Sequence, residues 1–361
     1  MQNSRSSWKR ILLTSGVAGA LAVPLAVAPA AATDRTDWTV QVIASGLKNP
    51  RGVTALRDGT VLVAEAGEGR PGCAVGEKCV AATGAVFAVD GNRQGRVVTG
   101  LASVAEGAEA GAPASANGPS NVLPDHRGGY IVVSGLGGTT GERTALGADA
   151  ATLGTVFRTS DNKVLADLTD HETRLNPDGG DVHANPWSLV RSGCGFLTTD
   201  AGANTVIRSA PGGRTSTAAV VPKNELPSGA AESVPTGIAK AADGTVYVAD
   251  MSGGQVDASR IWKIAPGGEP EVLATGMTNL VDIALDEKGD LLALSYSQAP
   301  LAGPPQPGAV FAVGTGTGDV TEIPTDGKLK QPTGIEADGN GGVYITNKTL
   351  GTDGELVHLS R

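Results

Sequence analysis

The chain has 361 residues, of which 52 are glycine, 21 are proline and only 3% are aromatic. Its formal net charge of −9 excludes charge-driven binding to phosphate backbones or anionic lipid, so we expect no nucleic-acid partner. Glycine and proline fall at regular turns rather than in low-complexity tracts. The composition therefore favours an all-β fold with many tight turns over disorder.

Residues 1–32 have the pattern of a secretory signal peptide. A basic segment is followed by an apolar, alanine-rich stretch, and Ala30–Ala32 offers a cleavage site. A retained membrane anchor is the alternative, but the small residues at the end of the stretch and the charged residues after it favour cleavage. We expect bacterial-type export, an extracellular protein with no membrane span after cleavage, and a single domain over residues 33–361.

The segment Val234–Gly276 is the clearest structural unit in the chain. It predicts four short strands, because stretches that alternate β-branched or aromatic residues with small ones are separated by Asp243-Gly244 and by a Pro-Gly-Gly turn. A lone four-stranded meander exposes one face of its sheet. It therefore needs neighbours built like itself.

Five further copies of this unit can be aligned along the chain. First strands begin at Pro50, Pro119, Pro186, Pro235, Leu280 and Pro332, and second strands begin at Val61, Tyr130, Phe196, Val246, Leu291 and Val343. Third strands begin at Ala85, Thr155, Thr205, Arg260, Ala309 and Glu355. Fourth strands begin at Arg96, Lys163, Ser216, Glu271 and Asp319, so the last copy lacks one.

The missing strand is found at the other end of the chain, where residues 38–46 have the fourth-strand pattern. A β-propeller closes its ring when one blade takes strands from both termini, and closure removes exposed sheet edges. The sequence thus predicts an all-β, six-bladed propeller with four-stranded blades, closed by this N-terminal strand. No convincing helical period follows residue 32, and the insertions at Gly67–Gly84, about 103–118 and Gly135–Gly154 are expected to be loops.

Cys73 and Cys79 lie close together in a loop, and in an exported protein we expect them to form a disulfide. Free thiols or a metal site are the alternatives, but a metal site would need further cysteine or histidine ligands nearby. Cys194 lies in or beside a strand and is expected to be a buried free thiol.

The repeat register predicts which side chains share one face of the ring. In propellers, the loop into each first strand and the loop after each second strand lie on the same face. The first group comprises Arg51, Asn121, Asn185, Trp187, Ser188 and Asp282, and the second comprises Glu65, Ser134, Asp200, Asp250, Tyr296 and Asn347. From these we select Arg51, Asn121, Asn185, Trp187 and Asp282 as candidate ligand-binding residues.

Three carboxylates on this face, Glu65, Asp250 and Asp282, suit Ca²⁺ or Mg²⁺, because these cations prefer oxygen ligands. The alternative is structural, since an aspartate at a strand end, such as Asp200 or Asp250, can bind the amides of the adjacent loop. His183 is the only histidine placed to reach the axis. It is a candidate acid or base, with a structural hydrogen bond as the alternative.

The ordered motifs resemble the ScyD/ScyE family of exported propellers. They are GRPGCAVGEKC in the first unit, HANPWSL and DAGANTVIR in the third, and VPTGIA, GTVYVAD and RIWKIAPGGEPEVLATG in the fourth. The resemblance covers nearly all of the chain after the signal peptide and implies an exported propeller related to the NHL-type and SMP-30-like groups. Some of the broader relatives bind substrates and others are divalent-metal lactonases, whose ligand set Glu65, Asn121, Asn185 and Asp282 imitate in a different context.

Two functions follow from these observations. The first is a secreted scaffold that binds a small molecule or a protein and has no chemistry of its own, which the absence of common catalytic motifs favours. The alternative is a divalent-metal-dependent hydrolase, lyase or lactonase acting on a small molecule at the central face.

Overall fold

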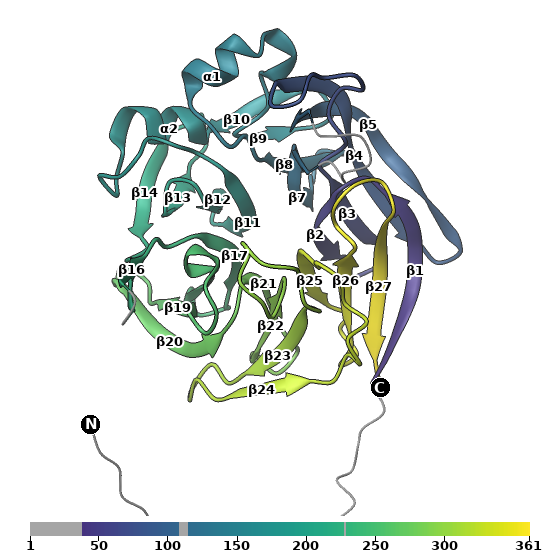
Figure 1. The fold of residues 1–361 in the computed structure, drawn as a ribbon, viewed down its shortest axis with the longest axis vertical. Helices are drawn as coiled ribbons and strands as arrows, with labels where there is room; N and C mark the ends of the chain where they lie inside the picture. Colours follow the sequence, from purple (N-terminus) through teal and green to yellow (C-terminus); the bar gives the residue numbers. More distant parts are fainter. Residues whose placement is uncertain (1–37, 108–114, 227–228) are drawn as a thin grey trace, which may run out of the picture. The chain divides into compact units, whose positions relative to one another are not determined.

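The computed structural model describes residues 38–107, 115–226 and 229–361. The expected signal peptide and the middle of the insertion at 103–118 lie outside the described residues. Within them, six antiparallel sheets form the blades of a propeller, and the first strand of each blade faces the centre of the ring (Figure 1). The predicted six-bladed, all-β fold is confirmed.

The blades follow the predicted repeats in chain order. Blade one contains β2 (Pro50–Ala55), β3 (Val61–Glu65), β4 (Lys78–Asp90), β5 (Arg93–Glu106) and β6 (Ala116–Asn117). Blade two contains β7 (Pro119–Pro124), β8 (Tyr130–Ser134), β9 (Thr155–Arg158) and β10 (Lys163–Asp167). Blade three contains β11 (Pro186–Ser192), β12 (Gly195–Asp200), β13 (Thr205–Ser209) and β14 (Thr215–Val220).

A short pair of strands, β15 (Asn224–Leu226) and β16 (Gly229–Ala231), precedes blade four. Blade four contains β17 (Pro235–Lys240), β18 (Val246–Asp250), β19 (Ser259–Ile264) and β20 (Pro270–Met277). Blade five contains β21 (Leu280–Leu285), β22 (Leu291–Ser295), β23 (Ala309–Val313) and β24 (Val320–Ile323).

Blade six is built from both ends of the described chain. It contains β25 (Gly334–Ala337), β26 (Val343–Asn347), β27 (Gly354–Ser360) and β1 (Thr39–Leu47). β1 runs antiparallel to β27, with Thr39 opposite Ser360 and Leu47 opposite Gly354. The N-terminal strand therefore supplies the outer strand of the last blade, within one residue of the predicted range.

The hydrophobic core lies between adjacent blades. Leu62 and Val86 of blade one, for example, pack with Val122 and Phe157 of blade two, and Phe157 is only 1% exposed. Equivalent clusters join every other pair of neighbouring blades, including blade six to blade one. Because each of these six clusters draws on two sheets, neighbouring blades share most of their core.

Contrary to the expectation of no helix, the described chain contains α1 (Thr140–Ala145), α2 (Leu168–Leu175) and the 3₁₀ turns η1 (Ala148–Ala150) and η2 (Ser252–Gly254). α1 and η1 lie in the insertion predicted as a loop. α1 begins at a capping box between Thr139 and Glu142, and the side chain of Asp167 caps α2. Both helices are too short to produce a visible period. None of the described helices is long and apolar enough to cross a membrane.

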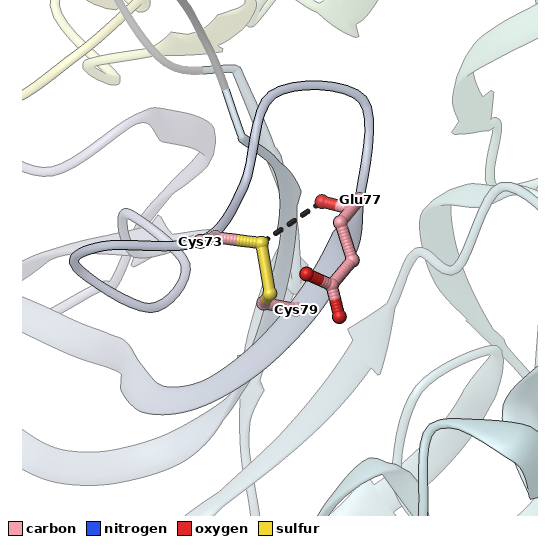
Figure 2. Close-up of side chains that lie close together, drawn as sticks. All are labelled: Cys73, Glu77 and Cys79. Atoms are coloured by element: carbon pink, nitrogen blue, oxygen red, sulfur yellow. Dashed lines mark hydrogen bonds between the residues drawn. A yellow bond between two sulfur atoms is a disulfide. The ribbon is translucent and has the colours of Figure 1, made fainter.

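The predicted disulfide between Cys73 and Cys79 is confirmed (Figure 2). It closes the loop ahead of β4, where the Sγ atom of Cys73 also lies 2.9 Å from the carbonyl oxygen of Glu77. The expectation for Cys194 was wrong, because this free thiol is exposed. Cys194 lies in the turn between β11 and β12, which projects away from the core.

Candidate functional site

A pocket of about 610 Å³ opens where the first strands of blades three and four begin, and we call it the blade 3–4 pocket. Its walls come from the loop ahead of β11, the loop after β12, the segment ahead of β17 and the residue after β18. Its polar lining includes Asp178, Asp181, His183, Asn185, Asn204, Glu232 and Thr236, and its apolar lining includes Val182, Trp187, Val234 and Met251.

Three of the candidates selected from the sequence, His183, Asn185 and Trp187, lie together in this pocket. His183 is exposed and Trp187 is partly buried. The backbone N–H of Asn185 donates a 2.6 Å hydrogen bond to Asp200, while its side-chain Oδ1 is buried without a hydrogen-bond partner. The pocket thus combines an imidazole and a flat aromatic wall, while the unsatisfied amide oxygen of Asn185 is buried away from solvent.

Arg51 supports the aromatic wall rather than lining the pocket. Its guanidinium lies over the ring of Trp187, with Cζ 5.5 Å from the ring centroid, and it donates a 2.9 Å hydrogen bond to the carbonyl of Ala116. Burial lowers the pKa of Arg51 to about 10, so the group remains charged at neutral pH. This stacking restrains the orientation of Trp187.

Asn121 and Asp282 lie elsewhere, in a cavity of about 190 Å³ lined by the first strands around the axis, which we call the axial cavity. Asn121 donates a 2.9 Å hydrogen bond to the hydroxyl of Ser188. Asp282 accepts from the amides of Ile283 and Ile335, both at 3.0 Å.

Two polar residues of the axial cavity, Asn121 and Asp282, need glycine beside them in the preceding blade. A Cβ atom on Gly52 would lie 2.8 Å from Nδ2 of Asn121, and one on Gly237 would lie 2.6 Å from Oδ1 of Asp282. Both distances are shorter than real Cβ contacts. This explains the glycine at the third position of the first strand in blades one and four.

The axial cavity also contains Glu336, which sequence reasoning missed. Burial raises the pKa of Asp282 to about 7, while burial and the charge of Asp282 raise the pKa of Glu336 to about 8. The sequence alone could have singled out Glu336, because the other five first strands have an uncharged residue at the same position: Thr54, Leu123, Val190, Ala239 and Ala284.

Four residues lie at the ends of second strands, and we call them strand-end acceptors. Each accepts a hydrogen bond from a backbone N–H in the loop that leads into the first strand of the same blade. The contacts are Lys48 N to Glu65 at 2.7 Å, Asn185 N to Asp200 at 2.6 Å, Val234 N to Asp250 at 2.8 Å and Lys330 N to Asn347 at 2.7 Å. These contacts support the structural alternative that the sequence raised for Asp200 and Asp250.

The structure does not bring the candidate metal ligands Glu65, Asp250 and Asp282 together. Glu65 is ion-paired with Arg96 at 2.7 Å, and the outer oxygen of Asp250 accepts from Nε1 of Trp262 at 3.0 Å.

Among the described residues, one group of three aspartate, glutamate, histidine or cysteine side chains has ligand atoms within 4.8 Å of one another. It consists of Cys73, Glu77 and Cys79 (Figure 2). Two of its three members form the disulfide.

Comparisons with known proteins agree on the fold. No family model and no curated protein matches the chain. Virginiamycin B lyase from Staphylococcus aureus, solved with quinupristin, is 14% identical with a TM-score of 0.51, and the match covers 90% of this chain and 100% of that one. A Bacteroides thetaiotaomicron protein of unknown function is 12% identical with a TM-score of 0.54, and the match covers 90% of this chain and 76% of that one.

Regucalcin, a calcium-binding protein from Agrobacterium tumefaciens, is 13% identical with a TM-score of 0.51, and the match covers 88% of this chain and 95% of that one. At these identities the likeness shows the fold alone. That fold is the six-bladed propeller described above.

Proposed function

We propose that this protein is an exported binding propeller of the ScyD/ScyE type that holds a small organic molecule in the blade 3–4 pocket. The convergence of His183, Asn185 and Trp187 on one cavity carries the proposal. A cavity of about 610 Å³ has the size of pockets that enclose small ligands. The disulfide between Cys73 and Cys79 supports export, because such bonds persist in oxidising compartments.

The lining favours a cationic or hydroxyl-rich ligand with one flat face. Trp187 offers an aromatic surface for stacking or for a cation–π contact. Asp178, Asp181 and Glu232 lie around it, and none of the described residues lining the pocket is lysine or arginine. An anionic ligand would meet like charges there.

The alternative function, a divalent-metal-dependent hydrolase, lyase or lactonase, needs the axial set Glu65, Asn121, Asn185 and Asp282 to share an ion. Glu65 pairs with Arg96, while Asn185 and Asp282 line different cavities. The arrangement therefore favours binding in the blade 3–4 pocket over metal-dependent chemistry at the axis. The small size of the pocket, about 610 Å³, also favours a small molecule over a protein partner.

The test compares two ligands that share a skeleton and differ in charge with a third that is uncharged and rich in hydroxyl groups. Tyramine, 4-hydroxyphenylacetate and glucose are titrated into the purified protein, with tryptophan fluorescence and melting temperature as readouts. We expect tyramine to bind more tightly than the carboxylate and to change the fluorescence of Trp187. Trp187→Ala should weaken tyramine binding at least about tenfold, the size of a desolvated cation–π contact.

Trp38→Phe is the matched control, because Trp38 contacts Arg361 and does not line the pocket. Equal affinity for tyramine and the carboxylate, or tyramine binding unchanged by Trp187→Ala, would contradict the proposal. Failure of all three compounds to bind would remove support for this ligand class.

A further inference from the structure

A further pocket, of about 200 Å³, lies between blades two and three, and we call it the blade 2–3 pocket. It is bordered by the turns between β7 and β8, between β11 and β12 and between β13 and β14. These turns follow first and third strands, whereas the blade 3–4 pocket opens where first strands begin, so the two pockets lie on opposite faces of the ring. The polar lining of the blade 2–3 pocket includes Asp125, Arg127, Arg158, Arg191, Cys194 and Ser209.

The charge of this pocket is opposite in sign to that of the whole chain. The chain carries a net charge of −9, but the described residues that line the pocket include three arginines and one acidic residue, Asp125. Arg158 is paired with Asp161, with Nε 2.9 Å from Oδ1. No ion pair within the described ranges includes Arg127 or Arg191. Two guanidinium groups are therefore available to an anionic ligand.

Contacts to both blades hold the guanidinium group of Arg191 in position. Its Cζ atom lies 5.7 Å from the ring centroid of Phe196 in blade three, and its Nη2 donates a hydrogen bond to the carbonyl oxygen of Pro124 in blade two. Both partners are uncharged. The contacts therefore orient the positive charge of Arg191 without neutralising it.

The apolar wall of the pocket contains an unused hydrogen-bond donor. Ile131, Leu165 and Phe196 line the pocket and belong to the core cluster between blades two and three. Ser209 lies opposite Phe196 in the β12–β13 pair and two residues after Ile207 of that cluster, so its side chain is on the same face of the sheet, toward blade two. Ser209 is 3% exposed, and its Oγ is buried without a hydrogen-bond partner. A free hydroxyl in this wall favours a ligand with polar atoms over a purely apolar one.

Cys194 adds a nucleophile to the pocket. Its thiol is free and exposed, in the turn between β11 and β12. The other two cysteines of the chain, Cys73 and Cys79, are bonded to each other. A thiolate reacts with low-molecular-weight disulfides by thiol–disulfide exchange, and positively charged neighbours attract those that carry acidic groups.

We propose that the blade 2–3 pocket binds a small acidic disulfide and that Cys194 forms a mixed disulfide with it. The carboxylate groups of the reagent pair with Arg127 and Arg191, which brings its S–S bond to the thiol. The thiolate of Cys194 attacks one sulfur atom of the reagent, whose S–S bond breaks as the new one forms. The released acidic thiol takes up the proton that Cys194 loses, and the reagent itself is the oxidant.

This site is independent of the ligand proposed for the blade 3–4 pocket, because it lies on the other face of the ring and attracts the opposite charge. A cavity of about 200 Å³ is smaller than pockets that enclose whole ligands, so we expect it to hold one half of the disulfide. That half is the one that stays attached to Cys194.

The experiment incubates the purified protein, without reductant, with glutathione disulfide, which is acidic, or with cystamine, which is cationic, and follows the mass of the intact chain. Each rate is divided by the rate at which the uncharged thiol N-acetylcysteinamide reacts with the same disulfide, so that the intrinsic reactivities cancel. We expect one addition per chain, mapped to Cys194, and a normalised rate at least about fivefold higher for glutathione disulfide. The net charge of the chain would produce the opposite preference, and added salt should reduce the one expected.

Arg127→Gln is the first variant, because the side chain of Arg127 is exposed and has no ion pair to lose. It should lower the preference for glutathione disulfide at least about threefold. Arg191→Gln should have the same effect, whereas Arg191→Lys should keep most of the preference because it keeps the charge. Arg93→Gln is the matched control, since it removes the same charge at an exposed position of β5 outside the pocket, and it should change nothing.

Cys194→Ser should receive no addition, which excludes exchange with the disulfide between Cys73 and Cys79 as its source. The proposal is overturned if the two normalised rates are equal or if cystamine reacts faster. A preference for glutathione disulfide that survives unchanged in both Arg127→Gln and Arg191→Gln would also overturn it, because the charge of the pocket would then have no part in it.

Discussion

Glu336 shows how one residue makes the stability of this fold depend on pH. The pKa values of Glu336 and Asp282 in the axial cavity are both raised by burial, to about 8 and about 7. The folded state therefore retains protons that the unfolded chain releases. The stabilisation is complete below the unfolded pKa values near about 4 and is lost as the pH rises through the folded values.

We expect the free energy of unfolding to fall between about pH 5 and about pH 9 in the wild type, and to fall less in Glu336→Gln. At the higher pH the variant should be more stable by at least about 1 kcal/mol, since one pKa unit corresponds to about 1.4 kcal/mol. Urea unfolding at the two pH values measures the difference. Glu322→Gln, on the exposed part of β24, is the control, and identical pH dependence in Glu336→Gln would contradict the assignment.

Some residue placements could be predicted from the sequence and others could not. His183, Asn185 and Trp187 surround the start of a first strand, so the repeat register alone is enough to place them on one face of the ring. Glu172 lies on a helix outside the repeat, and no register predicts that its side chain is buried. That burial depends on how α2 packs against blade three.

At the scale of the element, the strand-end acceptors join the loop into the first strand to the end of the second. Asp250 accepts from the backbone amides of Val234 and Ser252, both at 2.8 Å, and from Nε1 of Trp262. Removing the acceptor leaves three donors without their partner inside blade four. Each unsatisfied buried donor costs about 1–3 kcal/mol.

Asp250→Ala should therefore lower the free energy of unfolding by about 2–4 kcal/mol, measured by urea denaturation. Asp243→Ala provides the comparison within the same blade, because Asp243 is an exposed turn residue that accepts one backbone bond, from Thr245 at 2.9 Å. Its loss should cost less than about 1 kcal/mol. Equal losses of unfolding free energy in the two variants would contradict a larger contribution from the strand-end acceptor.

The strands could be predicted from the sequence, but the two short helices and the partners of the strand-end acceptors could not. The strands were predictable because alternation and turn residues recur in six registers, whereas α1 has six residues and α2 has eight, and each is too short for a helical period to stand out. The sequence feature that indicated the start of α1 was the capping box formed by Thr139 and Glu142. Likewise, the register fixed which face Glu65 and Asp250 occupy, but not that Arg96 and Trp262 take up their outer oxygens.

At the scale of the whole molecule, stability depends on a closed ring of inter-blade cores. Leu47 of β1 is 0% exposed and packs with Val53 and Leu356, so it joins blade six to blade one. Because six core clusters each join two neighbouring blades, damage at the closure should affect the cooperative unfolding of the entire ring.

Leu47→Ala should lower the free energy of unfolding by about 2–4 kcal/mol in a single transition, as expected for a buried leucine. Val42→Ala, in the same strand but 53% exposed, should change it by less than about 0.5 kcal/mol. Calorimetry and urea denaturation measure both variants. A partial transition in Leu47→Ala, with the remaining blades melting later, would contradict the cooperative ring.

The pairing of β1 with β27 also sets an order of events during synthesis. A ribosome delivers β1 before every other strand of the propeller, yet its partner is delivered last, and Thr39 bonds to Ser360 across 321 positions of the chain. Neighbouring blades can pack as they emerge, but the ring cannot close until the final strand is free. Such long-range contacts slow folding. Closure of the ring is therefore the last step of assembly, because it needs the last strand to be synthesised.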